Sequence, residues 1–281
     1  DYQAQYPPPL ISFDTPNVTF DSVGGKGANL LKLTLAGFAV PEGFIIPTSA
    51  YRQFVEHNRL AEQIRAILKN ADLGSPESLD SASSQIRAAF STGQVSPELR
   101  QAIEAGWQTL ETKPAAVRSS ATTEDLPDMS FAGQQDTFLN VTTAGALIDS
   151  VVKCWSSLWT ARAIGYRARN QIAHAEAALS VIVQIMVQSE VSGVLFTANP
   201  LTGLRREVVI DAAYGLGEAL VSGQVEPDHY VVDTETGQIS AKTIGAKSVV
   251  ISGKTEGGVQ TEEAGRSEAQ ALPDEAILRA A

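Results

Sequence analysis

The first half of the chain is dominated by apolar positions at helical spacing. Leucines at positions 30, 31, 33 and 35 follow a glycine cluster and stop at Gly37, which predicts a helix with a glycine-rich entry. Thr48 or Ser49 is expected to cap the next helix. Further helical periodicity is expected over residues 51–58, over 60–110 with breaks at 74–76 and 93–97, and over 146–169.

Strand patterns are sparse at first and become frequent after residue 178. Short strands are expected over 10–13, 115–117 and 136–141, and then over 179–187, 192–197, 207–212, 230–232 and 239–244. Glu235-Thr236-Gly237 separates the last two runs and indicates a hairpin. Mixed helices followed by a β-rich half favour an α+β fold with two unlike lobes.

The change in pattern also predicts where the lobes divide. We expect a leader over 1–19, an N-terminal lobe with the phosphate-binding loops over 20–176, and a β-rich C-terminal lobe over 177–281. The boundary falls near 172–178, where a helical pattern ends in polar and alanine-rich sequence. A last helix is expected to begin at Pro273 and run into the chain end, so we interpret the C-terminal lobe as truncated.

Composition narrows the function classes. Of 281 residues, 43% are hydrophobic and 19% charged, as in an ordinary globular protein. A net charge of −11 argues against a general nucleic-acid binder, but a few local cations can still hold a nucleotide. The single cysteine, Cys154, allows no internal disulfide and fits a reducing compartment, so we expect a cytoplasmic protein. No apolar run approaches the roughly 18 residues of a membrane helix, and no membrane partner is expected.

Two segments combine cations with small residues. In Gly24-Gly25-Lys26-Gly27, converging backbone N–H groups and one lysine suit a phosphate, although a turn that happens to hold a lysine explains the pattern equally well. Arg118 follows a short strand and precedes Ser119 and Ser120 in a stretch that we expect to be a loop. A guanidinium can fork two phosphate oxygens, whereas the alternative is a surface pair with Glu124 or Asp125.

Three further segments indicate a nucleotide site only in combination with these two. Residues 131–134 suit a flap over phosphates, but a tight turn is the simpler interpretation. Residues 183–187 are by default a buried strand, whose backbone edge could otherwise pair with an adenine while Met186 packs on the base. Residues 211–218 end a strand in a glycine turn that presents carboxylates, which bind Mg²⁺ when phosphates complete its ligands.

Other chemistry has little support. The P-loop pattern fails, because the positions that require its first glycine hold Ser240 and Ser248. No histidines stand at zinc spacing; we interpret His57, His174 and His229 as surface or packing residues. Cys154 follows helical spacing beside a tryptophan, which favours a buried structural thiol over a nucleophile.

Taken together, the segments resemble a known family. Residues 23–30 with 40–44, 116–127 with 130–134, 192–197 and 214–218 are similar, in this order, to motifs of the nucleotide domain shared by phosphoenolpyruvate synthase, pyruvate phosphate dikinase and rifampin phosphotransferase. The resemblance covers roughly residues 20–255. It implies an ATP-grasp-like fold whose two lobes hold ATP in a cleft between them, with Mg²⁺.

The resemblance also implies roles for single residues. Lys26 and Arg118 would hold phosphates, and Arg118 would also stabilise charge in the transition state. The Gly133 loop would close over the phosphates, and Glu218 would face the ribose or nucleotide. The complete set of expected nucleotide-binding residues is Gly25, Lys26, Arg118, Ser119, Gly133, Gln134, Thr137, Gln184, Met186, Val187 and Glu218. In this family, a His on a separate domain takes the β-phosphoryl group and passes it to an acceptor, leaving AMP and Pi.

The chain departs from the family's complete enzymes in two ways. It lacks the Glu-containing strand with Gln-Ser-Arg-Pro that closes the family's nucleotide domain, and it lacks the Thr-x-His motif of the phosphohistidine domain. We therefore expect it to bind ATP without completing transfer, with the main metal ligand and its partner domains elsewhere in the full-length protein. Pyruvate or a related acceptor is expected; the alternatives are a rifampin-inactivating enzyme and a non-catalytic nucleotide-binding module.

Overall fold

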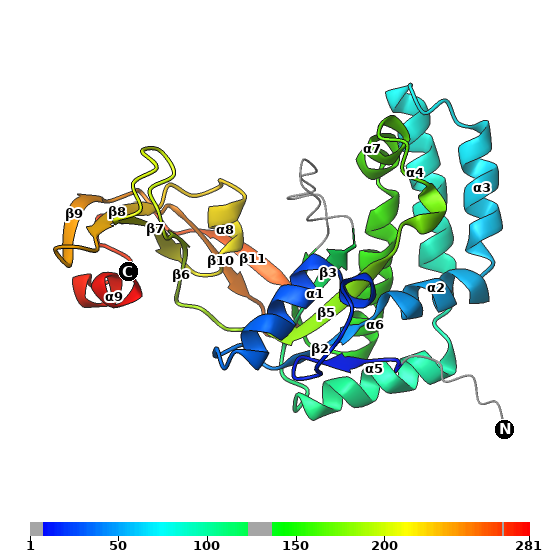
Figure 1. Cartoon of the computed structure of the whole chain (residues 1–281), viewed down its shortest axis with the longest axis horizontal. Helices are drawn as coiled ribbons and strands as arrows, with labels where there is room; N and C mark the ends of the chain where they lie inside the picture. The colour runs from blue at the N-terminus through cyan, green and yellow to red at the C-terminus, as the bar shows by residue number, and fades with distance from the viewer. Residues whose placement is uncertain (1–7, 123–136, 266) are drawn as a thin grey trace. The chain divides into compact units, whose positions relative to one another are not determined.

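The computed structural model describes residues 8–122, 137–265 and 267–281. The chain forms two compact units, the first ending at Met186 and the second beginning at Val187 (Figure 1). Both units mix helices and antiparallel sheet, so the expected α+β class is confirmed. None of the helices in the described ranges is long and apolar enough to cross a membrane.

The first unit holds a five-stranded sheet and most of the helices. Its elements in chain order are β1 (Ile11–Ser12), α1 (Phe20–Leu35), β2 (Gly43–Ile46), α2 (Thr48–His57), α3 (Leu60–Asn70), α4 (Pro76–Thr92), α5 (Pro97–Thr109), β3 (Ala115–Ala121), β4 (Thr137–Val141), α6 (Ala144–Ser156), η1 (Ser157–Trp159), α7 (Ala161–Arg169), η2 (His174–Glu176) and β5 (Leu179–Ile185).

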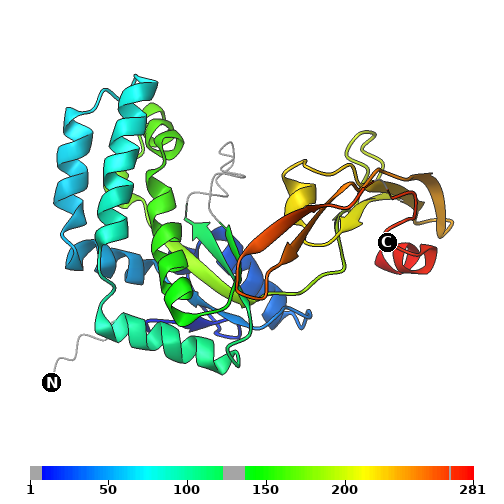
Figure 2. The same cartoon turned by 180° about the vertical axis from the view of Figure 1, so that it is seen from behind.

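The sheet of the first unit has the order β1-β2-β5-β3-β4, with every neighbouring pair antiparallel. Helix α1 packs on one face and α6 on the other, as the opposite views show (Figures 1 and 2). Because both faces are covered, the central strand β5 is an almost continuous apolar run. A small cluster that includes Val23, Ile45 and Ile182 lies under α1. The larger core, with Phe90, Ile103 and Trp155, lies among the other helices.

Three local predictions differ from the structure. Residues 118–121, expected as a loop, belong to β3, where they pair with β5. The helical pattern over 146–169 is broken at 157–160, where the Thr160 hydroxyl accepts from the Ala163 N–H and starts α7. Thr48 does not cap α2, because its hydroxyl donates to the Asp21 carbonyl (2.8 Å) and Pro47 is the N-cap residue.

The second unit is built around a four-stranded antiparallel sheet in the order β6-β7-β8-β9. Its elements are β6 (Val191–Phe196), β7 (Glu207–Tyr214), α8 (Glu218–Val221), β8 (Asp228–Asp233), β9 (Gln238–Thr243), β10 (Val249–Gly253), β11 (Val259–Glu263) and α9 (Asp274–Ala280). The hairpin predicted around Glu235-Thr236-Gly237 is present as β8–β9, whereas the β10–β11 hairpin was not predicted. The core includes Ile210, Tyr230 and Ile277.

The division between the units falls after β5, whereas the sequence placed β5 in the second lobe. The reason is strand pairing: β5 pairs with β3 along its whole length on one side and with β2 over residues 181–184 on the other. An apolar strand at the start of a β-rich region therefore belongs to the sheet that precedes it.

Candidate functional site

The glycine cluster is part of α1 and is locked onto the sheet. Gly24 adopts φ 66°, which kinks the helix, and a Cβ there would lie 2.4 Å from the Ser120 carbonyl oxygen. The Ser120 hydroxyl accepts from the Gly27 N–H (3.1 Å) and donates to the Val23 carbonyl (2.8 Å). An unbroken helix would pair those two groups directly. The close approach to β3 explains Gly24, and the Gly27 amide is already engaged by Ser120.

The two expected phosphate-binding cations come together at this junction. Lys26 projects from α1, and its Nζ donates to the Ser119 carbonyl (3.2 Å). Arg118 precedes Ser119 on β3, is half-buried, and stands opposite Thr137 of β4. Directly opposed residues place their side chains on the same face of a sheet. The structure therefore places Lys26 on the backbone next to Arg118, near the middle of β3, with Thr137 opposite Arg118.

Ser119 differs from its neighbour Arg118. Successive side chains point to opposite faces of a strand, so the Ser119 hydroxyl lies on the face opposite Arg118. It is only 1% exposed. The predicted Arg-Ser pair thus contributes a guanidinium and a backbone carbonyl to the junction, whereas the serine side chain turns inward. Gly133 and Gln134 lie outside the described residues, as do Glu124 and Asp125.

The expected adenine-binding segment has no free edge before residue 187. The side-chain amide of Gln184 donates to the Pro41 carbonyl (3.0 Å), and the backbone N–H of Met186 donates to the Pro114 carbonyl (2.9 Å). Met186 is buried, and its sulfur accepts from the Asn140 N–H (2.8 Å). Val187, in contrast, has 61% of its side chain exposed. Of these residues, Val187 alone has an exposed side chain.

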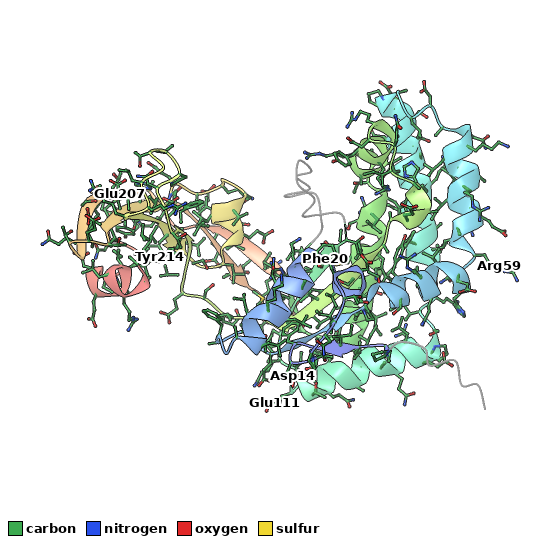
Figure 3. All side chains as sticks on the ribbon, viewed as in Figure 1. Asp14, Phe20, Arg59, Glu111, Glu207 and Tyr214 are labelled. Carbon is green, nitrogen blue, oxygen red and sulfur yellow. The ribbon has the colours of Figure 1, made fainter. Side chains whose placement is uncertain are left out.

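In the second unit, Glu218 stands at the end of a tightly held turn. Strand β7 ends at Tyr214 (Figure 3), and Gly215 follows with φ 78°. The next residue, Leu216, donates its N–H to the Ile251 carbonyl (2.8 Å). Glu218 opens α8 and is exposed. The other carboxylate that the sequence singled out, on Asp211, bonds His229 Nδ1 at 2.7 Å.

The remaining candidates are structural. Cys154 is fully buried, which confirms the predicted structural thiol. His174 Nδ1 accepts from Arg167 Nε (3.0 Å), and burial, followed by the positive charge of Arg167, lowers the pKa of His174. Ser180, missed from the sequence, donates to the Val23 carbonyl beside Ser120. A polar residue inside the apolar run of β5 was the available signal for it.

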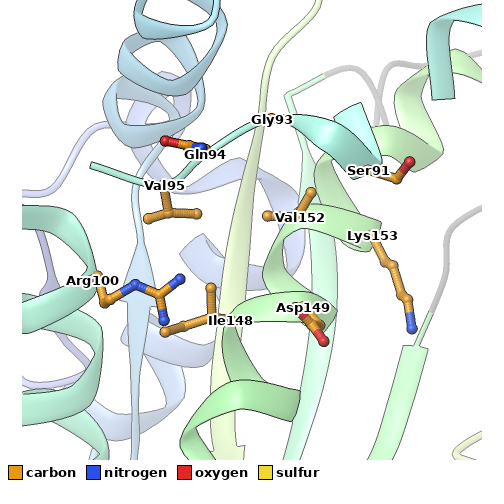
Figure 4. A pocket seen from close by; sticks show the side chains of 9 residues that line it. All are labelled: Ser91, Gly93, Gln94, Val95, Arg100, Ile148, Asp149, Val152 and Lys153. Atoms are coloured by element: carbon orange, nitrogen blue, oxygen red, sulfur yellow. The ribbon is translucent and has the colours of Figure 1, made fainter. Parts of the chain in front are cut away.

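The described residues form a side pocket but no cluster of metal ligands. Within residues 8–122, 137–265 and 267–281, no three His, Cys, Asp or Glu side chains gather as metal ligands. A hollow of about 580 Å³ lies between α4, α5 and α6 (Figure 4). It is lined by Ser91, Gly93, Gln94, Val95, Arg100, Ile148, Asp149, Val152 and Lys153. None of the expected nucleotide-binding residues that the structure describes lines this hollow.

Comparisons with known proteins identify the domain type. Residues 20–281 match the family described as pyruvate phosphate dikinase, AMP/ATP-binding domain. The chain is 39% identical over 305 residues to phosphoenolpyruvate synthase of Pyrococcus furiosus, which covers 92% of this chain and 37% of that protein. It is 42% identical over 263 residues to rifampicin phosphotransferase of Bacillus subtilis, covering 92% of this chain and 30% of that protein. The chain therefore spans about a third of the length of these relatives.

Proposed function

Because this chain belongs to the pyruvate phosphate dikinase AMP/ATP-binding domain family, we propose that it is the ATP-binding part of a dikinase-type phosphotransferase. Its α+β fold is of the ATP-grasp type in this proposal, and the protein works in the cytoplasm. The observation that carries the proposal is the convergence of Lys26 and Arg118 where α1 meets β3.

The chemistry of that junction suits a polyphosphate. The Arg118 guanidinium can bind two phosphate oxygens at once, while the Lys26 ammonium acts as a point charge beside it. Thr137 adds a hydroxyl directly opposite Arg118. Because the Ser120 hydroxyl fixes α1 against β3, both cations are held on rigid elements before the ligand arrives.

The other proposed contacts lie further along the chain. Val187 contacts the adenine, and Glu218 binds the ribose. The flap residues Gly133 and Gln134, which lie outside the described residues, belong to the proposal on the family resemblance alone. Mg²⁺ enters with the ATP phosphates, which supply oxygen ligands. Among the described residues, no three His, Cys, Asp or Glu side chains form a metal site.

Arg118 gives the sharpest test of nucleotide binding. Mg-ATP is titrated calorimetrically into the wild-type chain and into Arg118→Ala. Loss of a charge-assisted hydrogen-bonding group is expected to weaken binding by about 1.5–3 kcal/mol, or roughly 10- to 150-fold in Kd. The matched control is Arg100→Ala, which removes a half-exposed arginine near Glu104 and should leave Kd unchanged. Equal affinities for wild type and Arg118→Ala would remove Arg118 from the site.

The proposed reaction belongs to the full-length protein. The β-phosphoryl group of ATP passes to a His on a separate domain and then to pyruvate or a related acceptor, leaving AMP and Pi. Chromatography of the nucleotides after turnover should therefore show AMP. ADP as the sole product would contradict the dikinase reaction, and no turnover with any acceptor would favour a non-catalytic binding module.

A rifamycin acceptor is the second candidate. The observation in its favour is the 42% identity to rifampicin phosphotransferase of Bacillus subtilis. Supplying pyruvate and rifampicin separately in the same assay distinguishes the two, because the true acceptor alone should support AMP formation.

A further inference from the structure

A buried ion pair joins three segments of the second unit. Asp228, at the start of β8, pairs with Lys247, and both side chains are 0% exposed. The carboxylate also accepts from the N–H groups of Gly245 (3.0 Å) and Ala271 (2.6 Å) and from the Tyr230 hydroxyl (2.9 Å). Burial by itself raises the pKa of Asp228, but these bonds outweigh it and hold the pKa below its usual value. Both oxygens of the Asp228 carboxylate are therefore hydrogen-bonded.

The pair ties the connection between β9 and β10, residues 244–248, to the start of β8. The Lys247 N–H donates to the Glu226 carbonyl (3.1 Å), and its Nζ also donates to the Gly245 carbonyl (2.8 Å). Gly245 lies so close to the chain that a Cβ there would be 2.2 Å from the Pro227 carbonyl oxygen. Lys247 itself has φ 45°, a left-handed conformation that a side-chain residue keeps only when its surroundings hold it. Strand β10 begins two residues after Lys247. The position of Lys247 therefore constrains where β10 begins.

Strand β10 in turn carries the loop that presents Glu218. The Ile251 carbonyl accepts from the Leu216 N–H (2.8 Å), and a Cβ on Gly215 would lie 2.4 Å from the same oxygen. Gly215 and Leu216 thus rest directly on β10. Glu218 follows two residues later at the start of α8. A shift of β10 would therefore move Glu218.

We propose that Lys247 is a positioning residue for Glu218. Its bond to Asp228 holds residues 244–248 in place before β10, and β10 holds the loop at Leu216. This inference rests on the proposed function, because it gives the placement of Glu218 a purpose in nucleotide binding. Lys247 is suited to the task because its side chain bonds Asp228 at the start of β8 while its backbone lies two residues before β10. An apolar replacement would leave the buried carboxylate without its cation.

The first measurement is hydrogen exchange at the Leu216 amide in Lys247→Met. We expect this amide to exchange at least about tenfold faster, while the amides of β7 and β8 keep their protection. Lys242→Met is the matched control, because it removes an exposed lysine that pairs with Asp274 in the same unit. Lys242→Met should leave the exchange rates of the Leu216 amide and of the β7 and β8 amides unchanged. If Lys247→Met loses protection throughout the sheet, Asp228→Asn replaces it, since it keeps the shape of the side chain. Sheet-wide loss in that variant too would overturn the specific role.

The second measurement is a double-mutant cycle on the Kd for Mg-ATP. Lys247→Met should raise Kd about tenfold when Glu218 is present and less than about twofold in a Glu218→Ala background, because coupled residues are not additive. Equal losses in both backgrounds, or unchanged Leu216 exchange, would overturn the positioning role. A wild-type chain that shows no saturable binding would overturn the proposed function, whereas the exchange result would still decide whether Lys247 holds the loop.

Discussion

Arg167 is a buried cation held by neutral groups. Its guanidinium donates to the Leu158 carbonyl (2.6 Å) and to His174 Nδ1 (3.0 Å), and it lies 5.0 Å from the centre of the Trp159 ring. Burial lowers the pKa of Arg167 to about 10, well above neutral pH, so the group stays charged. Because His174 must offer Nδ1 as an acceptor, the bond requires a neutral imidazole.

This bond predicts a pH dependence for the first unit. The folded pKa of His174 lies below its ordinary value of 6.5, so below about pH 6.5 the unfolded state binds more protons than the folded state. Stability should therefore be full above about pH 6.5 and fall as the pH drops toward the lowered pKa. His174→Asn keeps an acceptor oxygen but cannot titrate, and should flatten this dependence. Urea unfolding at pH 7.5 and 5.5, followed by tryptophan fluorescence, measures it.

The control for this prediction is His57→Asn, at an exposed position on α2. It should retain the pH dependence of the wild type. Wild type and His174→Asn losing the same free energy of unfolding between the two pH values would show that His174 does not cause it.

At the scale of single residues, the sequence indicates candidate chemistry through residue type. A cation pair in Lys26 and Arg118 was recognisable because their residue types suit phosphate. The serines beside Arg118 were misread, because hydroxyls can serve a ligand or a close helix contact equally well. Only the pairing of β3 shows that Ser119 turns inward and that Ser120 holds α1. Strand alternation could not be applied to residues 118–121 while they were interpreted as a loop.

At the scale of elements, Ser120 closes the gap that Gly24 opens in α1. It bridges the Gly27 N–H and the Val23 carbonyl, while Ser180 bonds the same carbonyl from β5. The two serines therefore differ in how many backbone groups of α1 they bond. Without Ser180, both bridged groups keep Ser120; without Ser120, the Gly27 N–H loses that partner.

Ser120→Ala should accordingly cost more than Ser180→Ala. We expect about 1–3 kcal/mol for Ser120→Ala, the range for leaving a buried donor unpaired, and about 0.5–1.5 kcal/mol for Ser180→Ala. Urea unfolding followed by tryptophan fluorescence gives both values. If the two variants lose equal free energy, the bridging role of Ser120 is wrong.

Element existence was predicted more readily than element extent. The helical pattern continued through 157–160 because Leu158 and Trp159 pack in the same core as the residues before the break. No Gly or Pro marks that break, and only Thr160 signals a new helix. The β10–β11 hairpin was missed because β11 is largely exposed and polar, which hides strand alternation. Pairing with β10, which a local pattern does not contain, makes it a strand.

For the whole molecule, two unlike lobes were predictable but their boundary was not. Composition changes where the β-rich sequence begins, yet β5 completes a sheet begun more than a hundred residues earlier by β2. Such long-range pairing leaves no local signal. The hydrophobic clusters of the described residues are each confined to one unit. Separate cores indicate that the units can unfold separately.

Tryptophan fluorescence makes this separation measurable, because all three tryptophans, at 107, 155 and 159, belong to the first unit. Ile103→Ala and Ile210→Ala each leave a cavity in the core of one unit. Each should lower the free energy of unfolding by about 2–5 kcal/mol. Ile103→Ala should lower the urea midpoint seen by fluorescence. Ile210→Ala should leave that midpoint in place and instead speed hydrogen exchange in β7 and β8. A fluorescence midpoint that falls equally in both variants would mean that the two cores unfold as one cooperative unit.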